Sequence, residues 1–292
     1  MSGTSVQRYG GREFTSAEID TIRCLIAQNP EANRAGLSRL VSRTLGWLKP
    51  NGGLKEMSCR VSMLRMHRAE LIHLPPPRKV NGNGKRYRRR TTHAETEEVP
   101  IFTPAGEFDD LRLELVRGRT ASHLWNEYID RYHYLGYQPL RGDQLRYFAL
   151  EGGRILALLG FCAAVWKTAP RDNYIGWTIA QRKQRLHLVT NNARFLILPW
   201  IHSKNLASRI LSRTTRRLAM DWKERYGYRP VLVETFVECG RFHGTCYKAA
   251  NWLWLGQTTG RGRLDIGGKD GLPIKSVLVY PLQTNFRQEL CI

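Results

Sequence analysis

The chain has 292 residues and carries 46 Lys and Arg against 25 Asp and Glu, a formal net charge of +21. Hydrophobic residues make up 42% of the chain and aromatic residues 10%, so a folded globular protein is expected rather than a disordered one. The sequence shows no apolar run long enough for a transmembrane helix and no apolar segment near its start that resembles a signal peptide. We therefore expect a protein that neither spans a membrane nor enters the secretory pathway.

The basic charge indicates the kind of partner, and the cysteines indicate the cellular compartment. A charge of this size attracts polyanions, and we favour DNA over a membrane surface because no basic amphipathic helix with an aromatic face stands out. The six cysteines are scattered and form no C-x-x-C pair. Free cysteines of this kind are typical of the reducing cytoplasm, so a cytoplasmic protein is expected.

Residues 13–77 have the pattern of three short helices. Thr15 and Glu18 stand at the spacing of a capping box ahead of an apolar stripe. Asn33 is placed to begin the second helix and Gly46 to end it. These signals predict a small helical domain at the N-terminus.

In the third helix, Met57, Val61 and Leu64 are predicted to face inward. The residues expected to face outward and reach DNA are Lys55, Arg60 and Arg65, with Ser58 and Ser62 on the same flank as Arg65. Three helices followed by the turn "IHLPPP" suggest a winged helix-turn-helix. A helical domain that binds a protein or supports the core is the alternative.

A basic arm follows the helices. Within "RKVNGNGKRYRRR", residues 78–90, seven of thirteen positions are Lys or Arg, namely Arg78, Lys79, Lys85, Arg86, Arg88, Arg89 and Arg90. Such an arm can follow DNA phosphates or enter a minor groove, and a solvated linker is the alternative. The acidic stretch "AETEEVP" ends it. We predict a helical domain over 1–77, a linker over 78–100 and a core domain over 101–292.

From residue 101 onward, strands and helices alternate, which predicts an α+β core with a mixed sheet flanked by helices. A hairpin is expected to turn at Gly152–Gly153, and a strand to bulge near Asn191–Asn192. The long helix over residues 204–228 carries apolar residues on one side. Its other side bears Asn205, Arg209, Arg213 and Arg216, a predicted phosphate-binding face if it is not simply solvated.

The order of these elements resembles the GNAT acetyltransferase fold, and "YKAANW" resembles the tyrosine helix of that family. The resemblance implies that Tyr247 is a general acid. GNAT enzymes hold coenzyme A at a glycine-rich turn, whereas the matching turn here, "PWIHSKNLASRI", has no glycine. We therefore do not expect acetyl-coenzyme A as a cofactor, although an acyltransferase stays the second alternative.

A denser set of motifs, including "HYLGY", "NNARFLILPW" and "YGYRPVLVETFV", looks like the DruA family over residues 108–265. Members of that family occur in the Druantia anti-phage system, and relatives lie near mobile elements. The resemblance implies a bacterial protein that acts in defence or on mobile DNA. Other proteins of the system, such as a helicase, are then expected partners.

Three residues are candidates for chemistry. Glu234 lies in an apolar strand and is either a structural ion-pair partner or a base. Tyr247 is either a nucleophile on a phosphodiester or a packed tyrosine. His133 ends a predicted helix. The remaining predicted cleft residues are Asn191, Asn192, Arg194, Asn205, Cys246 and Asn251.

The sequence leaves open whether the protein is an enzyme. The leading hypothesis is a DNA-binding defence protein, with or without strand cleavage, and the alternative is a transposase- or nuclease-like enzyme. Mg²⁺ is expected only with cleavage. Its candidate ligands, Asp143, Asp172, Glu234 and Asp265, form no short motif, so no metal site is predicted.

Overall fold

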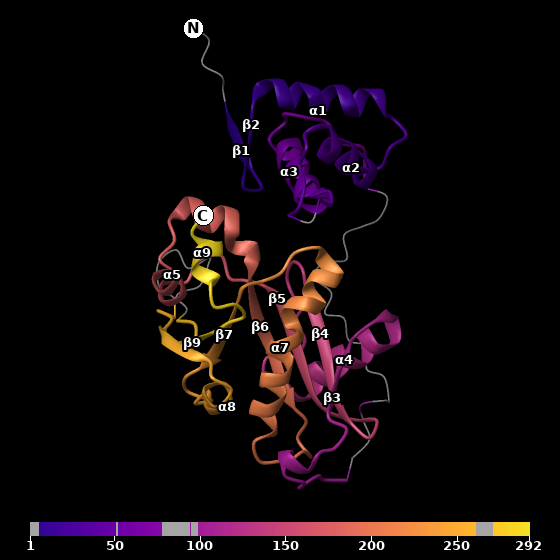
Figure 1. Ribbon diagram of the computed structural model, residues 1–292. Helices are drawn as coiled ribbons and strands as arrows, with labels where there is room; N and C mark the ends of the chain where they lie inside the picture. Colours follow the sequence, from indigo (N-terminus) through magenta and orange to yellow (C-terminus); the bar gives the residue numbers. More distant parts are fainter. Residues whose placement is uncertain (1–5, 51, 78–93, 95–98, 261–270) are drawn as a thin grey trace. The chain divides into compact units, whose positions relative to one another are not determined.

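The computed structural model describes residues 6–50, 52–77, 94, 99–260 and 271–292. The chain divides into two compact units, residues 1–87 and residues 88–292 (Figure 1). Each unit has a buried hydrophobic core of its own. The basic residues predicted for the arm over 78–90 lie outside the described residues.

The N-terminal unit contains the three expected helices and one hairpin. Its elements are β1 (Gln7–Tyr9), β2 (Arg12–Phe14), α1 (Ser16–Gln28), α2 (Arg34–Thr44) and α3 (Glu56–Arg68). The Thr15 hydroxyl accepts a hydrogen bond from the Glu18 N–H, and the Glu18 carboxylate accepts one from the Thr15 N–H, so the capping box forms. The Asn33 side chain accepts from the N–H groups of Ala35 and Gly36, which confirms it as the cap of α2.

The buried face of α3 differs from the prediction. Met57 and Val61 are 60% and 43% exposed, whereas Cys59, Met63 and Met66 are buried. Ser62, predicted to face outward, is also buried. The turn of the β1–β2 hairpin accounts for this, because a Cβ atom at Gly10 would lie 2.3 Å from the Ser62 Oγ. The hairpin therefore packs against a side of α3 where a small side chain is required.

The winged form of the helical domain is not confirmed. The hairpin precedes the three helices, and no strand follows α3 within the described residues up to 77. The connection between α2 and α3 runs from Leu45 to Lys55 and contains a bridge between Leu48 and Leu54. It is longer than the three or four residues of a tight helix-turn-helix.

The core unit is a seven-stranded mixed sheet flanked by helices, in the strand order β3-β4-β5-β6-β7-β9-β8. Its strands are β3 (Arg112–Leu115), β4 (Leu145–Glu151), β5 (Arg154–Ala163), β6 (Val189–Ile197), β7 (Leu232–Glu238), β8 (Leu253–Gln257) and β9 (Lys275–Pro281). Its helices are α4 (Gly118–Tyr132), α5 (Ala169–Ile175), α6 (Ile179–Arg185), α7 (Leu206–Tyr226), α8 (Thr245–Ala249) and α9 (Phe286–Leu290), with short 3-10 turns at Ala105–Glu107 and Leu186–Leu188.

This order contains the predicted alternation of strands and helices, with the hairpin and the long helix in it. The β4–β5 hairpin turns at Gly152 and Gly153, both with positive φ, as predicted. The structure adds α5, α6, β9 and α9, which the sequence analysis did not predict. Strand β9 lies between β7 and β8, so the chain passes the sheet edge at β8 before returning inward.

Helix α7 crosses one face of the sheet (Figure 1) and buries its predicted apolar side, including Ile210, Leu218 and Trp222. Its opposite side is not the free basic face that was predicted. Arg209 donates to the Phe108 carbonyl, Arg213 to the Leu111 carbonyl, and Arg217 to the Leu113 carbonyl, over 2.8 Å in the last case.

These carbonyls belong to the edge strand β3 and the segment before it. An edge strand exposes unpaired backbone groups that must be covered. The spacing of four residues between Arg213 and Arg217 matches the alternate carbonyls of Leu111 and Leu113, so these arginines satisfy the backbone of the edge. Among the arginines predicted for the phosphate-binding face, Arg216 is exposed.

Candidate functional site

The sheet opens between β6 and β7. The two strands are parallel and pair from Val189 with Leu232 to Asn191 with Glu234, where the pairing of β6 with β7 ends. Beyond this point β6 continues on β5 alone, and β7 continues on β9 alone. The two strands therefore diverge toward their C-terminal ends and leave a wedge in the middle of the sheet.

A bulge in β6 lies where the strands diverge. Gly160 of β5 pairs with Arg194, while the next residue, Phe161, pairs with Asn192, so Ala193 is the extra residue. The Asn192 amide donates to the carbonyls of Gly160 and Arg194 over 3.3 and 3.1 Å. Asn192 therefore holds the bulge in place, at the position where the sequence predicted one.

A cavity of 1260 Å³ occupies the wedge. Its walls are the diverging halves of β6 and β7 and the loops around them. The aromatic residues that line it are Tyr132, Tyr134, Phe195, Phe236, Phe242 and Tyr247, and the basic ones are Lys167, Arg194, Arg241 and Lys275. No Asp or Glu is among the described residues that line it. The cavity is therefore suited to an anionic ligand.

Arg194 is the most enclosed cation of this wall. Burial lowers the pKa of its guanidinium below the ordinary value. It donates to the carbonyl of its neighbour Ala193 over 2.7 Å, and no carboxylate within the described part of the chain forms an ion pair with it. A desolvated cation without a counter-ion is costly, and an incoming anion would lower that cost.

His133 lines the same cavity at the end of α4. Burial and the nearby Arg194 lower the pKa of His133 to about 4, so the ring is neutral near pH 7. Its Nδ1 accepts a hydrogen bond from the Leu135 N–H at 3.2 Å, which places the ring proton on Nε2. His133 therefore offers a hydrogen-bond donor to a ligand.

Tyr247 and Cys246 of α8 also line the cavity. The Tyr247 hydroxyl donates to the Asn192 Oδ1 at 2.7 Å, and its ring packs against Phe195 and Trp252. Burial raises the pKa of Tyr247 and that of the Cys246 thiol. Because a nucleophile must be deprotonated, this environment disfavours both as nucleophiles.

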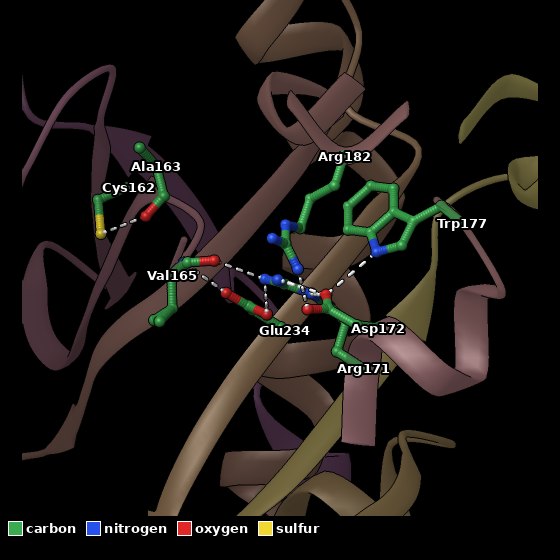
Figure 2. A network of polar contacts seen from close by, with 8 residues as sticks. All are labelled: Cys162, Ala163, Val165, Arg171, Asp172, Trp177, Arg182 and Glu234. Atoms are coloured by element: carbon green, nitrogen blue, oxygen red, sulfur yellow. Dashed lines mark hydrogen bonds and ion pairs between the residues drawn. The ribbon is translucent and has the colours of Figure 1, made fainter. Parts of the chain in front are cut away.

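Glu234 takes part in a buried ion pair. It is fully buried, accepts from the Val165 N–H at 2.8 Å, and pairs with the equally buried Arg171 at 2.8 Å (Figure 2). Burial raises the pKa of Glu234, and the guanidinium of Arg171 counteracts part of that effect. It is absent from the described lining of the cavity, so the structural role, and not that of a base, fits this position.

The network continues through Arg171. The guanidinium also donates to the Val165 carbonyl at 2.7 Å and to Asp172 at 2.7 Å. Asp172 further accepts from Trp177 Nε1 and Arg182 (Figure 2). Both backbone groups of Val165 are thus fixed. The loop that follows β5 and carries Lys167 and Thr168 into the cavity wall is thereby fastened to β7, α5 and α6.

The other predicted residues are dispersed. Asn191 lines the cavity, and its side-chain oxygen has no hydrogen-bond partner. Asn205 precedes α7 in a left-handed conformation and Asn251 follows α8 in another, and neither is in the cavity lining. In the N-terminal unit, Lys55 and Arg60 are half-buried and Arg65 is exposed.

Of the carboxylates considered for a metal, Asp172 lies in the ion-pair network and Asp143 accepts from the Tyr228 hydroxyl at 2.9 Å. Asp265 lies outside the described residues. No group of three or more potential metal ligands occurs in the described part of the chain. No helix among the described residues is long and apolar enough to span a membrane.

Comparison with known families identifies the chain. The family model described as "Druantia protein DruA" matches residues 65–272, which is more than half of the sequence. The chain belongs to the DruA family. Membership implies a role in anti-phage defence. A search of curated protein sequences found no match.

Solved acetyltransferase structures match part of this chain at low similarity. A spermidine/spermine N-acetyltransferase from Vibrio cholerae, solved with manganese ions, is 9% identical and covers 61% of this chain and 96% of its own, with a TM-score of 0.38. A GNAT-family acetyltransferase from Streptococcus pneumoniae is 10% identical and covers 60% and 100%, with a TM-score of 0.39. A polyamine N-acetyltransferase from Drosophila melanogaster is 12% identical and covers 58% and 100%, with a TM-score of 0.37. These scores carry no information about chemistry.

The DruA-family core does not fit the pyrophosphate of coenzyme A. A glycine-rich turn would let backbone N–H groups approach the phosphates closely. The turn before α7 instead places the Leu206 side chain in the core, and Ala207, with its Cβ, lines the cavity. The N-terminal end of α7 therefore lacks a glycine-rich cradle for the pyrophosphate.

Sequence reasoning missed several lining residues of the DruA-family cavity. Lys167 and Thr168 follow β5, while Arg241 and Phe242 follow β7. Strand β7 runs parallel to β6, and residues after the carboxyl ends of parallel strands commonly form sites. Strand β5 pairs antiparallel with both of its neighbours, so this rule does not find Lys167 and Thr168. Lys275 opens β9, and the apolar run "VLVY" was a readable strand signal for it.

Proposed function

We propose that this DruA-family protein binds DNA in anti-phage defence, and that residues 1–90 supply most of the affinity. The charge distribution carries the proposal. Residues 1–90 contain eighteen Lys and Arg against six Asp and Glu, so they hold +12 of the formal +21. Affinity for DNA comes largely from cations that displace counter-ions along the phosphates.

The arginines of the core unit also support the proposal that residues 1–90 supply most of the affinity for DNA. Three arginines of α7 are engaged with the edge of the sheet, and Arg171 and Arg182 with buried carboxylates. These guanidinium groups are therefore held by contacts within the protein. In the N-terminal unit, Arg65 and Arg68 in the last turn of α3 are exposed. We propose α3 and the arm over 78–90 as the DNA-contacting parts, whether or not the domain is a winged helix.

The compartment and partners follow from the same proposal. All six cysteines are free thiols, which is typical of the cytoplasm. Another protein of the defence system, such as a helicase, is the expected partner for any step that consumes energy.

The test is a salt titration of binding to a labelled DNA duplex. One variant replaces Arg86, Arg88, Arg89 and Arg90 with Gln. Each lost phosphate contact should reduce the log–log salt slope by about 0.9. The control replaces four exposed basic residues of the core with Gln, namely Lys183, Lys223, Arg229 and Lys248, which removes the same charge.

We expect the arm variant to lose most duplex affinity and the control to lose little. Equal losses would show that net charge alone attracts DNA, and a flat salt dependence in the unmodified protein would contradict DNA binding itself.

Strand cleavage is the alternative function. Denaturing gels of the same samples with Mg²⁺ test it, since cut strands that disappear in Tyr247→Phe would make the protein an enzyme.

A further inference from the structure

The cavity between β6 and β7 combines unpaired cations with accessible aromatic rings. Lys167 and Lys275 form no ion pair with the described residues, and Arg194 likewise has no carboxylate partner there. Arg241 lies 3.7 Å from Glu238, a loose contact in which the Arg241 side chain is 54% exposed and the Glu238 side chain 18% exposed. The charge of this wall is thus available to phosphates.

The rings form a cluster at the loop after β7. Tyr134 stacks on His133 with ring centroids 4.9 Å apart and meets Phe242 edge-on at 5.2 Å. The guanidinium of Arg241 lies 5.0 Å from the centroid of Tyr134. Phe242 is 47% exposed and lines the cavity, so its ring offers the more accessible surface. A large exposed aromatic residue beside cations is costly in water and favourable under a planar ligand.

A polyanion with planar rings is a nucleic acid, and its strandedness follows from the geometry. In a duplex the base faces are stacked on one another and cannot reach a side chain. In a single strand they are free, and proteins that bind single strands combine basic grooves with aromatic residues on which bases stack. The volume of 1260 Å³ exceeds the roughly 300–1,000 Å³ of a typical small-molecule pocket, which leaves room for a base together with its flanking phosphates.

We infer that this cavity binds an unpaired nucleotide of a DNA strand, with its base against Phe242 and Tyr134 and a phosphate near Arg194. The inference rests on the proposed DNA-binding function and adds a second site, in the core unit. Neutral His133 contributes an Nε2–H donor to the nucleotide. Duplex DNA engages residues 1–90, whereas unpaired bases engage the core.

The experiment compares two strands of equal length and charge in fluorescence anisotropy with the full-length protein. One is oligothymidylate, and the other carries abasic residues throughout. Attraction of phosphates to the arm is the same for both, so the affinity ratio isolates contacts to bases. We expect oligothymidylate to bind about tenfold more tightly, as stacking of bases on aromatic side chains predicts.

Phe242→Ala should bring the ratio close to one. The matched control is Phe102→Ala, since Phe102 is exposed in the same unit, stacks on His202 at 5.1 Å, and lies outside the described cavity lining. Equal binding of both strands by the unmodified protein, or an unchanged ratio in Phe242→Ala, would overturn the inference. So would a rise in melting temperature with coenzyme A and none with oligothymidylate.

These outcomes are separate from the test of the proposed function. Loss of duplex binding in the arm variant with no base-dependent ratio would leave the DNA-binding function in place and remove only the core site. Conversely, a tenfold ratio that disappears in Phe242→Ala, together with an arm variant that keeps its duplex affinity, would support the core site and contradict the role of residues 1–90.

Discussion

Replacing Glu234 with Gln separates the structural role of this residue from a chemical one. The substitution keeps the size of the side chain and removes its charge. In the folded protein Arg171 then loses its contact with a carboxylate at 2.8 Å but keeps Asp172 at 2.7 Å. Both members of the broken pair are fully buried, so water cannot replace the lost partner.

Removing one member of a buried ion pair typically costs about 3–5 kcal/mol. Because Arg171 keeps its contact with Asp172, we expect Glu234→Gln to cost about 3 kcal/mol of stability, the lower end of this range. For a unit the size of residues 88–292, a loss of 1 kcal/mol lowers the melting temperature by roughly 2–4 °C. The expected decrease is therefore roughly 6–12 °C.

The assay is urea and thermal unfolding followed by circular dichroism. Glu224→Gln is the control, because Glu224 pairs with Arg117 at 3.1 Å and both side chains are 67% exposed. An exposed pair of this kind contributes little, so the control should stay within about 0.5 kcal/mol of the unmodified protein. A Glu234→Gln protein as stable as the control would refute the structural interpretation, and Glu234 would return as a candidate base.

Two further predictions concern the same part of the core. Gly160→Ala should destabilise the protein by about 1–3 kcal/mol, because its Cβ would lie 3.0 Å from the Trp125 ring and 3.1 Å from Leu140. The control is Gly106→Ala, whose Cβ would have nothing within 4 Å. Equal stability of the two variants would contradict the close approach at Gly160. His133 has a pKa of about 4 in the folded protein against an ordinary value of 6.5, so the unfolded chain binds a proton first and stability falls as the pH is lowered from about 6.5 to about 4. His133→Asn should flatten the pH dependence of the unfolding free energy over this window, and identical profiles would show that the ring is not held neutral.

The sequence was informative wherever the deciding partners are close in the chain. Thr15 with Glu18, Asn33 with the N–H groups after it, and the Gly152–Gly153 turn are all local, and each formed as predicted. The face of α3 was not decidable in this way. Positions 57, 61 and 64 and positions 59, 63 and 66 have the same helical spacing, and only the packing of the hairpin selects the second set.

Long-range pairings account for the rest. Arg171 lies 63 residues before Glu234, so nothing near Glu234 in the sequence shows that it has an ion-pair partner. The basic side of α7 read as a surface for phosphates because the carbonyls it covers lie about a hundred residues earlier. The wedge itself follows from a bulge and a short strand pairing, of which only the bulge left a sequence signal, the Asn191–Asn192 pair.

During synthesis, the arginines of α7 cover the edge of β3 only after a delay. The carbonyls of Phe108, Leu111 and Leu113 leave the ribosome 101 to 104 residues before the arginines that cover them. At a synthesis rate of about 5–20 residues per second, these carbonyls stay uncovered for roughly 5–20 s. During that interval the nascent sheet can pair with a neighbouring chain, and once α7 docks, another strand must displace three guanidinium groups to do so.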